Sequence, residues 1–182
     1  MPFEIIHVQR EHLPALRLIG KRHTDADRGA DGGFGGRHRE WNEKQCCREL
    51  AGLGFSDAVT PGLLGLMTWR ADYENRPREE CRFSYWIGHF FPPGTPAPDG
   101  YSCIDLPESD VGVAWIRGDC GSIFGEKPHE AAHGKLFEKG WGKLRENAGG
   151  EKTFVFFERY NPERFKPDAQ GLFTLDYGFY LA

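Results

Sequence analysis

The order of the predicted secondary-structure elements occurs twice along the chain, and this repeat constrains the possible folds more than any other feature. Each copy runs strand, strand, helix, strand, strand, and prolines gather between the two copies, in residues 92–98. Prolines at this density cannot join a β-ladder and suit a stiff linker. A repeated supersecondary unit indicates internal duplication even where identity is faint. We therefore expect two half-repeats, residues 1–92 and 99–182, joined by a proline-rich linker at 93–98 into one domain.

Apolar alternation and helical spacing place the elements within each half. The first half is expected to hold strands at 3–8, 16–19, 62–69 and 82–87 and a helix at 37–53. The second half is expected to hold strands at 101–106, 111–116, 153–158 and 175–180 and a helix at 129–147. Each helix carries a tryptophan at a packing position, Trp41 or Trp141. Paired strands with one helix per half predict an α+β fold of antiparallel sheets with the helices packed on one face. The other face, or the cleft between the halves, is then free for a ligand.

Composition and charge argue against nucleic-acid binding. The chain is 39% hydrophobic and 27% charged, with a net charge of −4, which is typical of a globular protein with one core or two small half-cores. Binding to phosphates needs a concentrated basic face. The densest basic cluster, Arg37-His38-Arg39, is followed at once by Glu40 and Glu43, which is typical of a solvated helix start. We expect no direct nucleic-acid partner.

The sequence also favours a cytoplasmic location. No apolar run is long enough for the core of a signal peptide or for a membrane span, so we expect no membrane partner. The five cysteines are odd in number and lack the paired spacing of a metal site: Cys46, Cys47, Cys81, Cys103 and Cys120. Reduced thiols are therefore expected.

One strand of the second half places a carboxylate among aromatic side chains. Alternation along this strand puts four side chains on one face: Phe154, Phe156, Glu158 and Tyr160. A carboxylate in such surroundings is costly to desolvate unless a partner compensates its charge. The residue pattern leaves two interpretations open. Glu158 is a functional acid in a pocket, or it has a structural role, paired with an arginine such as Arg82 or Arg117 or simply facing solvent.

Several local motifs, taken in order, resemble the gyrase-inhibitor-like (GyrI-like) effector-binding domains, which occur alone or fused to AraC-type and MerR-type DNA-binding domains. The motifs are Ile6-His7-Val8 with Leu18-Ile19-Gly20, Tyr85-Trp86-Ile87-Gly88, Tyr101 to Ile104 with Leu106-Pro107, Val113 to Gly118, and Phe157-Glu158-Arg159-Tyr160-Asn161-Pro162. Each motif is weak alone, but together they cover nearly the whole chain. The resemblance implies a stand-alone member that binds small molecules, in the manner of multidrug-binding regulators, with any partner regulator unknown.

The resemblance also gives Glu158 a role, because the acid on this strand of GyrI-like domains faces planar cations. Aromatic faces stack on a flat guest and attract its positive charge, and a buried carboxylate completes the match. The side chains expected to bind the ligand are Glu158, Tyr160, Phe156, Trp69, Tyr85, Trp86, Phe91 and Trp115. For each aromatic residue alone, plain core packing is the competing interpretation. The expected ligand is small and largely aromatic, its charge is left open, and no cofactor is expected.

Two departures from the family pattern bear on this prediction. The family usually carries an acidic residue near the C-terminus, where this chain has Gly178-Phe179-Tyr180, so we expect no second carboxylate near the pocket. No DNA-binding segment stands on either side, so the chain is not expected to be a fused regulator.

Two enzymatic alternatives remain. Related members of the superfamily hydrolyse strained, cyclopropane-containing genotoxins, and Glu158 with a raised pKa could act there with Tyr160 or Tyr85. A third possibility is a zinc peptidase, because His129-Glu130-Ala131-Ala132-His133 matches the His-Glu-x-x-His pattern. We place it last and expect no metal, because the motif falls on a first helical turn that we expect to be exposed. Gly134 also weakens that helix, and Lys139-Gly140 stand where a third histidine would be expected.

Overall fold

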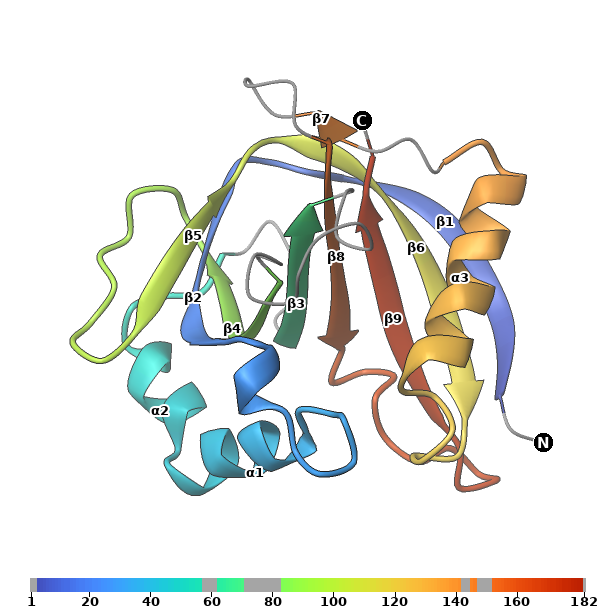
Figure 1. Cartoon of the computed structure of the whole chain (residues 1–182), viewed down its shortest axis with the longest axis horizontal. Coiled ribbons are helices and arrows are strands. Elements are labelled where there is room, and N and C mark those ends of the chain that lie inside the picture. The colour runs from blue at the N-terminus through green and yellow to red at the C-terminus, as the bar shows by residue number, and fades with distance from the viewer. Residues whose placement is uncertain (1–2, 57–61, 71–82, 142–144, 147–151, 182) are drawn as a thin grey trace.

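The protein has an α+β fold in which one antiparallel sheet carries helices on one of its faces (Figure 1). The computed structural model describes residues 3–56, 62–70, 83–141, 145–146 and 152–181. The strands are β1 (Phe3–Leu13), β2 (Leu16–His23), β3 (Leu63–Arg70), β4 (Ser84–Phe91), β5 (Ser102–Leu106), β6 (Ser109–Gly118), β7 (Arg145–Glu146), β8 (Lys152–Tyr160) and β9 (Phe173–Tyr180). The helices are α1 (Gly35–Glu43), α2 (Cys46–Ala51) and α3 (Glu126–Glu138), with a short 3-10 turn at Asp25–Asp27.

The two halves of the chain form a single sheet rather than the separate sheets that the sequence predicts. The strand order is β1-β6-β9-β8-β3-β4-β2-β5, with β7 beside β8. Pairing of β3 with β8 joins the halves at the centre of the sheet. In addition, β1 pairs with β6 and β5 pairs with β2, so the first strand of each half lies at the far edge of the other half. Such pairings are set by contacts between distant segments, which the local apolar pattern does not encode.

Both predicted helices are interrupted or end early, for reasons that lie in the backbone. The helix predicted at 37–53 is split into α1 and α2, because Gln45 takes a left-handed conformation with φ of 51°. The helix predicted at 129–147 ends at Glu138. Beyond it, Gly140 has a φ of 75°, and the amides of Gly140 and Trp141 donate to the carbonyls of Phe137 and Leu136. This is a glycine-based helix stop, and it leaves Trp141 outside the helix that was expected to carry it.

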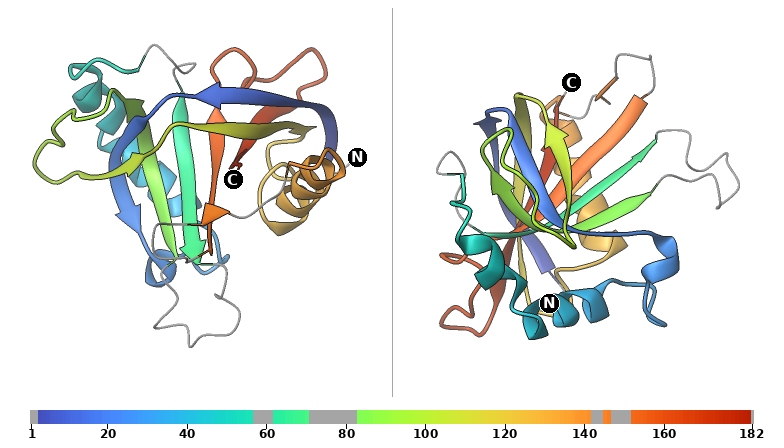
Figure 2. Two further views of the ribbon diagram at one scale, coloured as in Figure 1. Left: turned by 90° about the horizontal axis from the view of Figure 1, so that it is seen from above. Right: turned by 90° about the vertical axis from the view of Figure 1, so that its left-hand side faces the viewer.

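The sheet buries apolar side chains on both faces. The helix-covered face packs side chains of α1, α2 and α3 against the sheet, among them Trp41, Leu50 and Leu136. In the second cluster, every fully buried member lies on a strand, Leu18, Leu66 and Phe157 among them. Strands β1 and β6 are strongly curved. They arch across the top of the molecule in Figure 1 and cross the front of the left-hand view in Figure 2. We call the two sides the helix face and the strand face.

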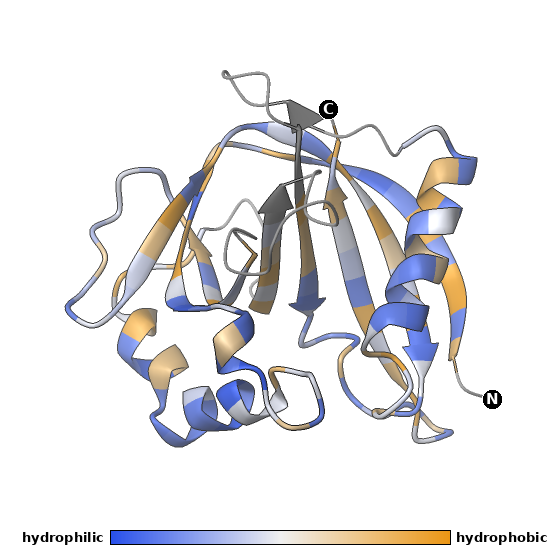
Figure 3. Ribbon diagram, viewed as in Figure 1, coloured by the Kyte–Doolittle hydropathy of each residue, from blue (hydrophilic) through white to orange (hydrophobic). Residues whose placement is uncertain are grey.

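Figure 3 shows both hydrophobic and hydrophilic residues along α3. This mixed composition is expected of a helix that buries one side against the sheet. None of the helices in the described part of the chain has the length and apolarity needed to cross a bilayer.

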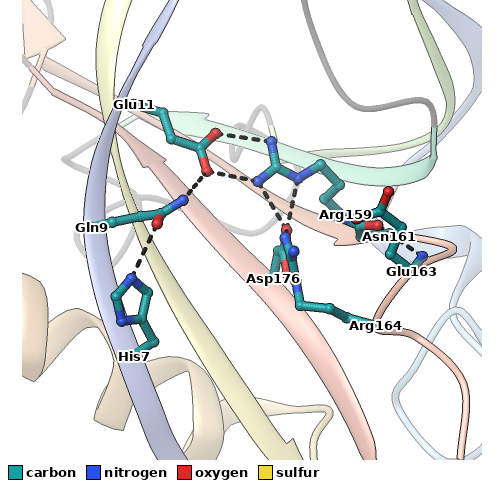
Figure 4. A network of polar contacts seen from close by, with 8 residues as sticks. All are labelled: His7, Gln9, Glu11, Arg159, Asn161, Glu163, Arg164 and Asp176. Carbon is teal, nitrogen blue, oxygen red and sulfur yellow. Dashed lines mark hydrogen bonds and ion pairs between the residues drawn. The ribbon is translucent and has the colours of Figure 1, made fainter.

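A network of charged side chains lies on the strand face (Figure 4). Arg159 donates to both carboxylate oxygens of Glu11 at 2.9 and 3.0 Å, and also to Asp176 at 2.9 Å. Arg164 makes a two-pronged contact with Asp176 at 2.6 and 2.9 Å. Two guanidinium groups thus compensate two carboxylates, and burial of Arg159 and Asp176 is tolerated because each charge has partners.

Candidate functional site

Glu158 lies on the helix face, near the centre of the sheet, with both carboxylate oxygens in contact with other side chains. The residue is only 5% exposed. Its Oε2 atom accepts hydrogen bonds from the hydroxyls of Tyr85 and Tyr160, each at 3.1 Å. Its Oε1 atom lies 2.8 Å from Nε2 of His129. This distance is that of an ion pair once His129 is protonated, although Nε2 is not in good hydrogen-bond geometry with any described residue.

Helix α1 covers one side of this carboxylate. Nε2 of His38 lies 2.8 Å from the Tyr85 hydroxyl and 3.4 Å from the Tyr160 hydroxyl. Phe34, just before the helix, stacks almost parallel on the ring of Tyr85 with a centroid distance of 4.3 Å. His38 therefore contacts both tyrosine hydroxyls that donate to Glu158.

Helix α3 covers the other side, through both histidines of the His-Glu-x-x-His motif. The ring of His129 stacks on Tyr177 with a centroid distance of 4.5 Å and an interplanar angle of 25°. Nε2 of His133 lies 3.0 Å from the Tyr177 hydroxyl. The spacing of four residues puts both histidines on the same side of the helix, and the phenyl ring of Phe156 lies beside both of them.

These contacts show that one argument against the zinc hypothesis, the expected exposure of the motif, was wrong. The motif does begin on the first turn of α3, but it is not exposed, since the His129 side chain is only 15% accessible. The two histidines face Glu158 and Tyr177, while Glu130 points to solvent. Among the described residues, no group of three or more histidine, cysteine, aspartate or glutamate side chains is placed to hold a metal ion.

The electrostatics of the site favour an ionised Glu158. Burial by itself would raise the pKa of this carboxyl, but the contact with His129, the electrostatic interaction with His38 and the Tyr160 hydroxyl outweigh it, and the pKa lies below its ordinary value. This differs from the raised pKa expected of a hydrolytic acid. Burial, with the nearby Glu158 charge, raises the pKa values of Tyr85, Tyr160 and Tyr177 well above their ordinary value, so these hydroxyls stay protonated as donors.

Gly65 makes room for the two groups at the centre of the site. A Cβ atom on this residue would lie 2.3 Å from the Tyr85 hydroxyl and 3.0 Å from Oε2 of Glu158. A glycine inside an apolar strand often marks a close approach of another group. This signal in the sequence could have identified Gly65 as a site residue.

Comparison with known proteins adds a fold likeness. No family model matches the chain, and neither does any curated protein. Among solved structures, SAV2435 bound to tetraphenylphosphonium aligns with a TM-score of 0.64 and 17% identity, over 97% of this chain and 94% of that one. A protein from Staphylococcus aureus MU50, assigned provisionally to bacterial transcription regulation, aligns with a TM-score of 0.54 and 18% identity, over 96% of this chain and 97% of that one. This chain shares their fold. The likeness fits a GyrI-like fold.

The structure brings together four of the side chains that the sequence places in a GyrI-like pocket: Glu158, Tyr160, Phe156 and Tyr85. Together with Tyr177 they lie on the helix face, not on the opposite face that the sequence was expected to leave free for a ligand. The partner of Glu158 is a histidine rather than Arg117, which pairs with Glu4 and Asp168. The alternative partner, Arg82, lies outside the described residues.

The remaining predicted side chains lie elsewhere. Trp86 belongs to the strand face, and Trp115 packs against the same cluster with the Arg164 guanidinium 4.2 Å from its ring. Phe91 shares the face of Tyr85 but stands six residues farther along β4, against Phe55. The side chain of Trp69 lies outside the described part of the chain.

Position 178, where GyrI-like domains usually carry an acid, faces away from the site. Tyr177 and Gly178 are neighbours on β9 and so point to opposite faces. A Cβ atom at Gly178 would lie 2.2 Å from the Phe157 ring on the strand face. A side chain at this position would not reach Glu158, so an acid here would not add a second carboxylate to the site.

Proposed function

We propose that this protein is a GyrI-like effector-binding domain that binds small, flat aromatic cations at Glu158. One observation carries the proposal: Glu158 is buried and ionised, and its charge is held by two tyrosine hydroxyls and a histidine. Burying a carboxylate is costly unless a positive group completes it. A ligand that supplies a positive charge and a flat surface satisfies both the carboxylate and the aromatic rings around it.

His129 supports this choice of ligand, because its imidazole already makes the contacts that such a ligand would make. The ring is flat, stacks on Tyr177 and lies at ion-pair distance from Glu158. We infer that the incoming cation displaces His129 and takes its place between Tyr177 and the carboxylate. Tetraphenylphosphonium, which is bound in the SAV2435 structure, is also an aromatic cation; it is tetrahedral at phosphorus, and each of its phenyl rings offers a flat face.

The proposal also covers the internal duplication. Matching β1, β2, β3 and β4 with β5, β6, β8 and β9 turns the strand order of the sheet into its own reverse. This symmetry supports two half-repeats, residues 1–92 and 99–182, with residues 93–98 between them. The site then lies where the halves meet, since β3 and β8 are the central pair and Glu158 stands opposite Gly65.

Calorimetric titration with tetraphenylphosphonium tests the proposed function. Wild-type protein is expected to bind, and Glu158→Gln is expected to lose at least about tenfold in affinity, because the buried counter-charge is gone while the shape is kept. Glu138→Gln is the matched control, since it removes an exposed carboxylate on α3 with the same change in net charge. Equal affinity in wild type and Glu158→Gln would refute the role of the carboxylate.

The alternative, hydrolysis of cyclopropane-type genotoxins in the same site, is less well supported. As an acid Glu158 would need a proton, which its lowered pKa removes at neutral pH, and as a base the lowered pKa makes it weaker. Repeated turnover of such a substrate, lost in Glu158→Gln, would favour the enzyme over the binding protein.

A further inference from the structure

A second cluster of reactive side chains lies on the helix face, beneath α1 and α2. Sγ of Cys47 in α2 lies 3.2 Å from Nε2 of His89 in β4, and the indole N–H of Trp41 donates to the same sulfur at 3.0 Å. His89 stands four residues from Tyr85 along β4, which corresponds to about 13 Å. The cluster is therefore separate from Glu158, although α1 contributes to both places.

The hydrogen bonds of His89 fix where its proton resides. Its Nδ1 atom lies 3.0 Å from the carbonyl oxygen of Gly62, which can only accept. In the neutral ring Nδ1 therefore carries the hydrogen, and the lone pair of Nε2 points at Cys47. Burial lowers the pKa of His89 to about 4, so that this lone pair is free at neutral pH. A base thus faces the thiol, oriented by a third group.

Two further features suit the sulfur to act as a nucleophile. The Trp41 N–H points at Sγ and would stabilise negative charge that develops there. Cys47 is half-buried, whereas its neighbour Cys46 is buried, so Cys47 is the more accessible of the two adjacent residues. A nucleophile, a base in hydrogen-bond reach and a group that orients the base form the arrangement by which proteins activate thiols.

We propose that Cys47 and His89 form a second reactive site, at which Cys47 is alkylated by small, soft electrophiles such as activated alkyl halides. As the sulfur attacks the carbon, its proton passes to Nε2 of His89, the carbon–sulfur bond forms and the halide leaves with its electron pair. The imidazolium then releases its proton to water. The product is a stable thioether, so each protein molecule reacts with one electrophile and Cys47 cannot react again.

This assignment has a signature in the pH dependence of the reaction. An ordinary thiol reacts as thiolate, so its rate falls about tenfold per pH unit below its pKa of about 8.5. A thiol that gives its proton to the neutral ring of His89 during attack keeps a nearly constant rate as the pH falls, until His89 itself becomes protonated. Cys103 and Cys120, which are exposed, serve as internal controls in the same chain.

The experiment is competitive alkylation of the whole protein with iodoacetamide between pH 6 and pH 8, with the rate at each cysteine read by peptide mass spectrometry. At pH 6 we expect Cys47 to react at least about tenfold faster than Cys103 and Cys120, with an advantage that shrinks as the pH rises. His89→Phe, which keeps the ring but removes the base, is expected to abolish the advantage.

Two results would overturn the proposal. One is a Cys47 rate at pH 6 no greater than those of the exposed cysteines, or a pH slope equal to theirs. The other is an unchanged Cys47 rate in folded His89→Phe protein. The wild-type pH profile decides the matter alone if the variant does not fold.

Discussion

Replacing His129 by alanine removes the group that faces Glu158 in this structure, and we expect it to tighten the binding of tetraphenylphosphonium. The imidazole lies 2.8 Å from Oε1 of Glu158 and covers the ring of Tyr177. An arriving cation has to break the first contact and uncover the second. In His129→Ala both Oε1 of Glu158 and the part of the Tyr177 ring that His129 covers are already free.

The geometry of the ion pair sets the size of this effect. With His129 protonated, two full charges at 2.8 Å attract by about 6 kcal/mol at an effective dielectric constant of about 20. Desolvation cancels most of this attraction in a buried pair, which leaves roughly 1–2 kcal/mol. Since about 1.4 kcal/mol changes an equilibrium constant tenfold, we expect affinity to rise by about 5- to 30-fold.

The assay is calorimetric titration of wild type, His129→Ala and His133→Ala at pH 7. His133 is the control, because it contacts the Tyr177 hydroxyl from the next turn of α3 and its loss should not free the carboxylate. The unliganded His129→Ala protein should also be less stable than wild type, since the buried Glu158 loses the partner of its Oε1 atom. Weaker binding by His129→Ala would refute the reasoning, because the imidazole would then contribute to the ligand site instead of occupying it.

Two further predictions concern Gly65, which lies beside Tyr85 and Glu158, and the pH dependence of stability. Gly65→Ala is expected to displace the Tyr85 hydroxyl and weaken cation binding at least about fivefold. Gly178→Ala, on the opposite face, should cost about 1–3 kcal/mol of stability and leave the affinity of the folded protein unchanged. The reverse pattern in titration and urea unfolding would contradict the placement of the site. Burial lowers the pKa values of His89 and His133 from 6.5 to about 4. Between pH 6.5 and pH 4 the unfolded chain therefore binds protons that the folded chain does not. The free energy of unfolding should be at its full value above pH 6.5 and fall towards pH 4 by about 1.4 kcal/mol per pH unit for each histidine. Equal free energies of unfolding at pH 7 and pH 5 would contradict this prediction.

Much of the strand structure could be predicted from the sequence, because alternation is a local signal. The predicted strand at 153–158 corresponds to β8 (Lys152–Tyr160), and alternation places Phe156, Glu158 and Tyr160 on one face. The pairing of the strands could not be predicted from this local pattern. Joining of β3 to β8 and exchange of the edge strands depend on contacts between residues far apart in the chain.

The same limit explains which site residues were found. Tyr85 and Trp86 are consecutive on β4, so they point to opposite faces, and period-two reasoning could have excluded one of them. Tyr177 and His129 could not be placed beside Glu158 without the register of β8 against β9, in which Glu158 pairs with Tyr177, and without the docking of α3. The His-Glu-x-x-His pattern drew attention to His129, but as a zinc ligand rather than as the partner of a carboxylate.

A crystal structure of the protein with tetraphenylphosphonium bound tests the central claim most directly. We expect the phosphonium within about 6 Å of the Glu158 carboxylate and a phenyl ring stacked on Tyr177. The His129 ring should be turned away from its present contacts with both residues. A cation bound elsewhere, or a complex in which His129 still lies between Tyr177 and Glu158, would contradict it.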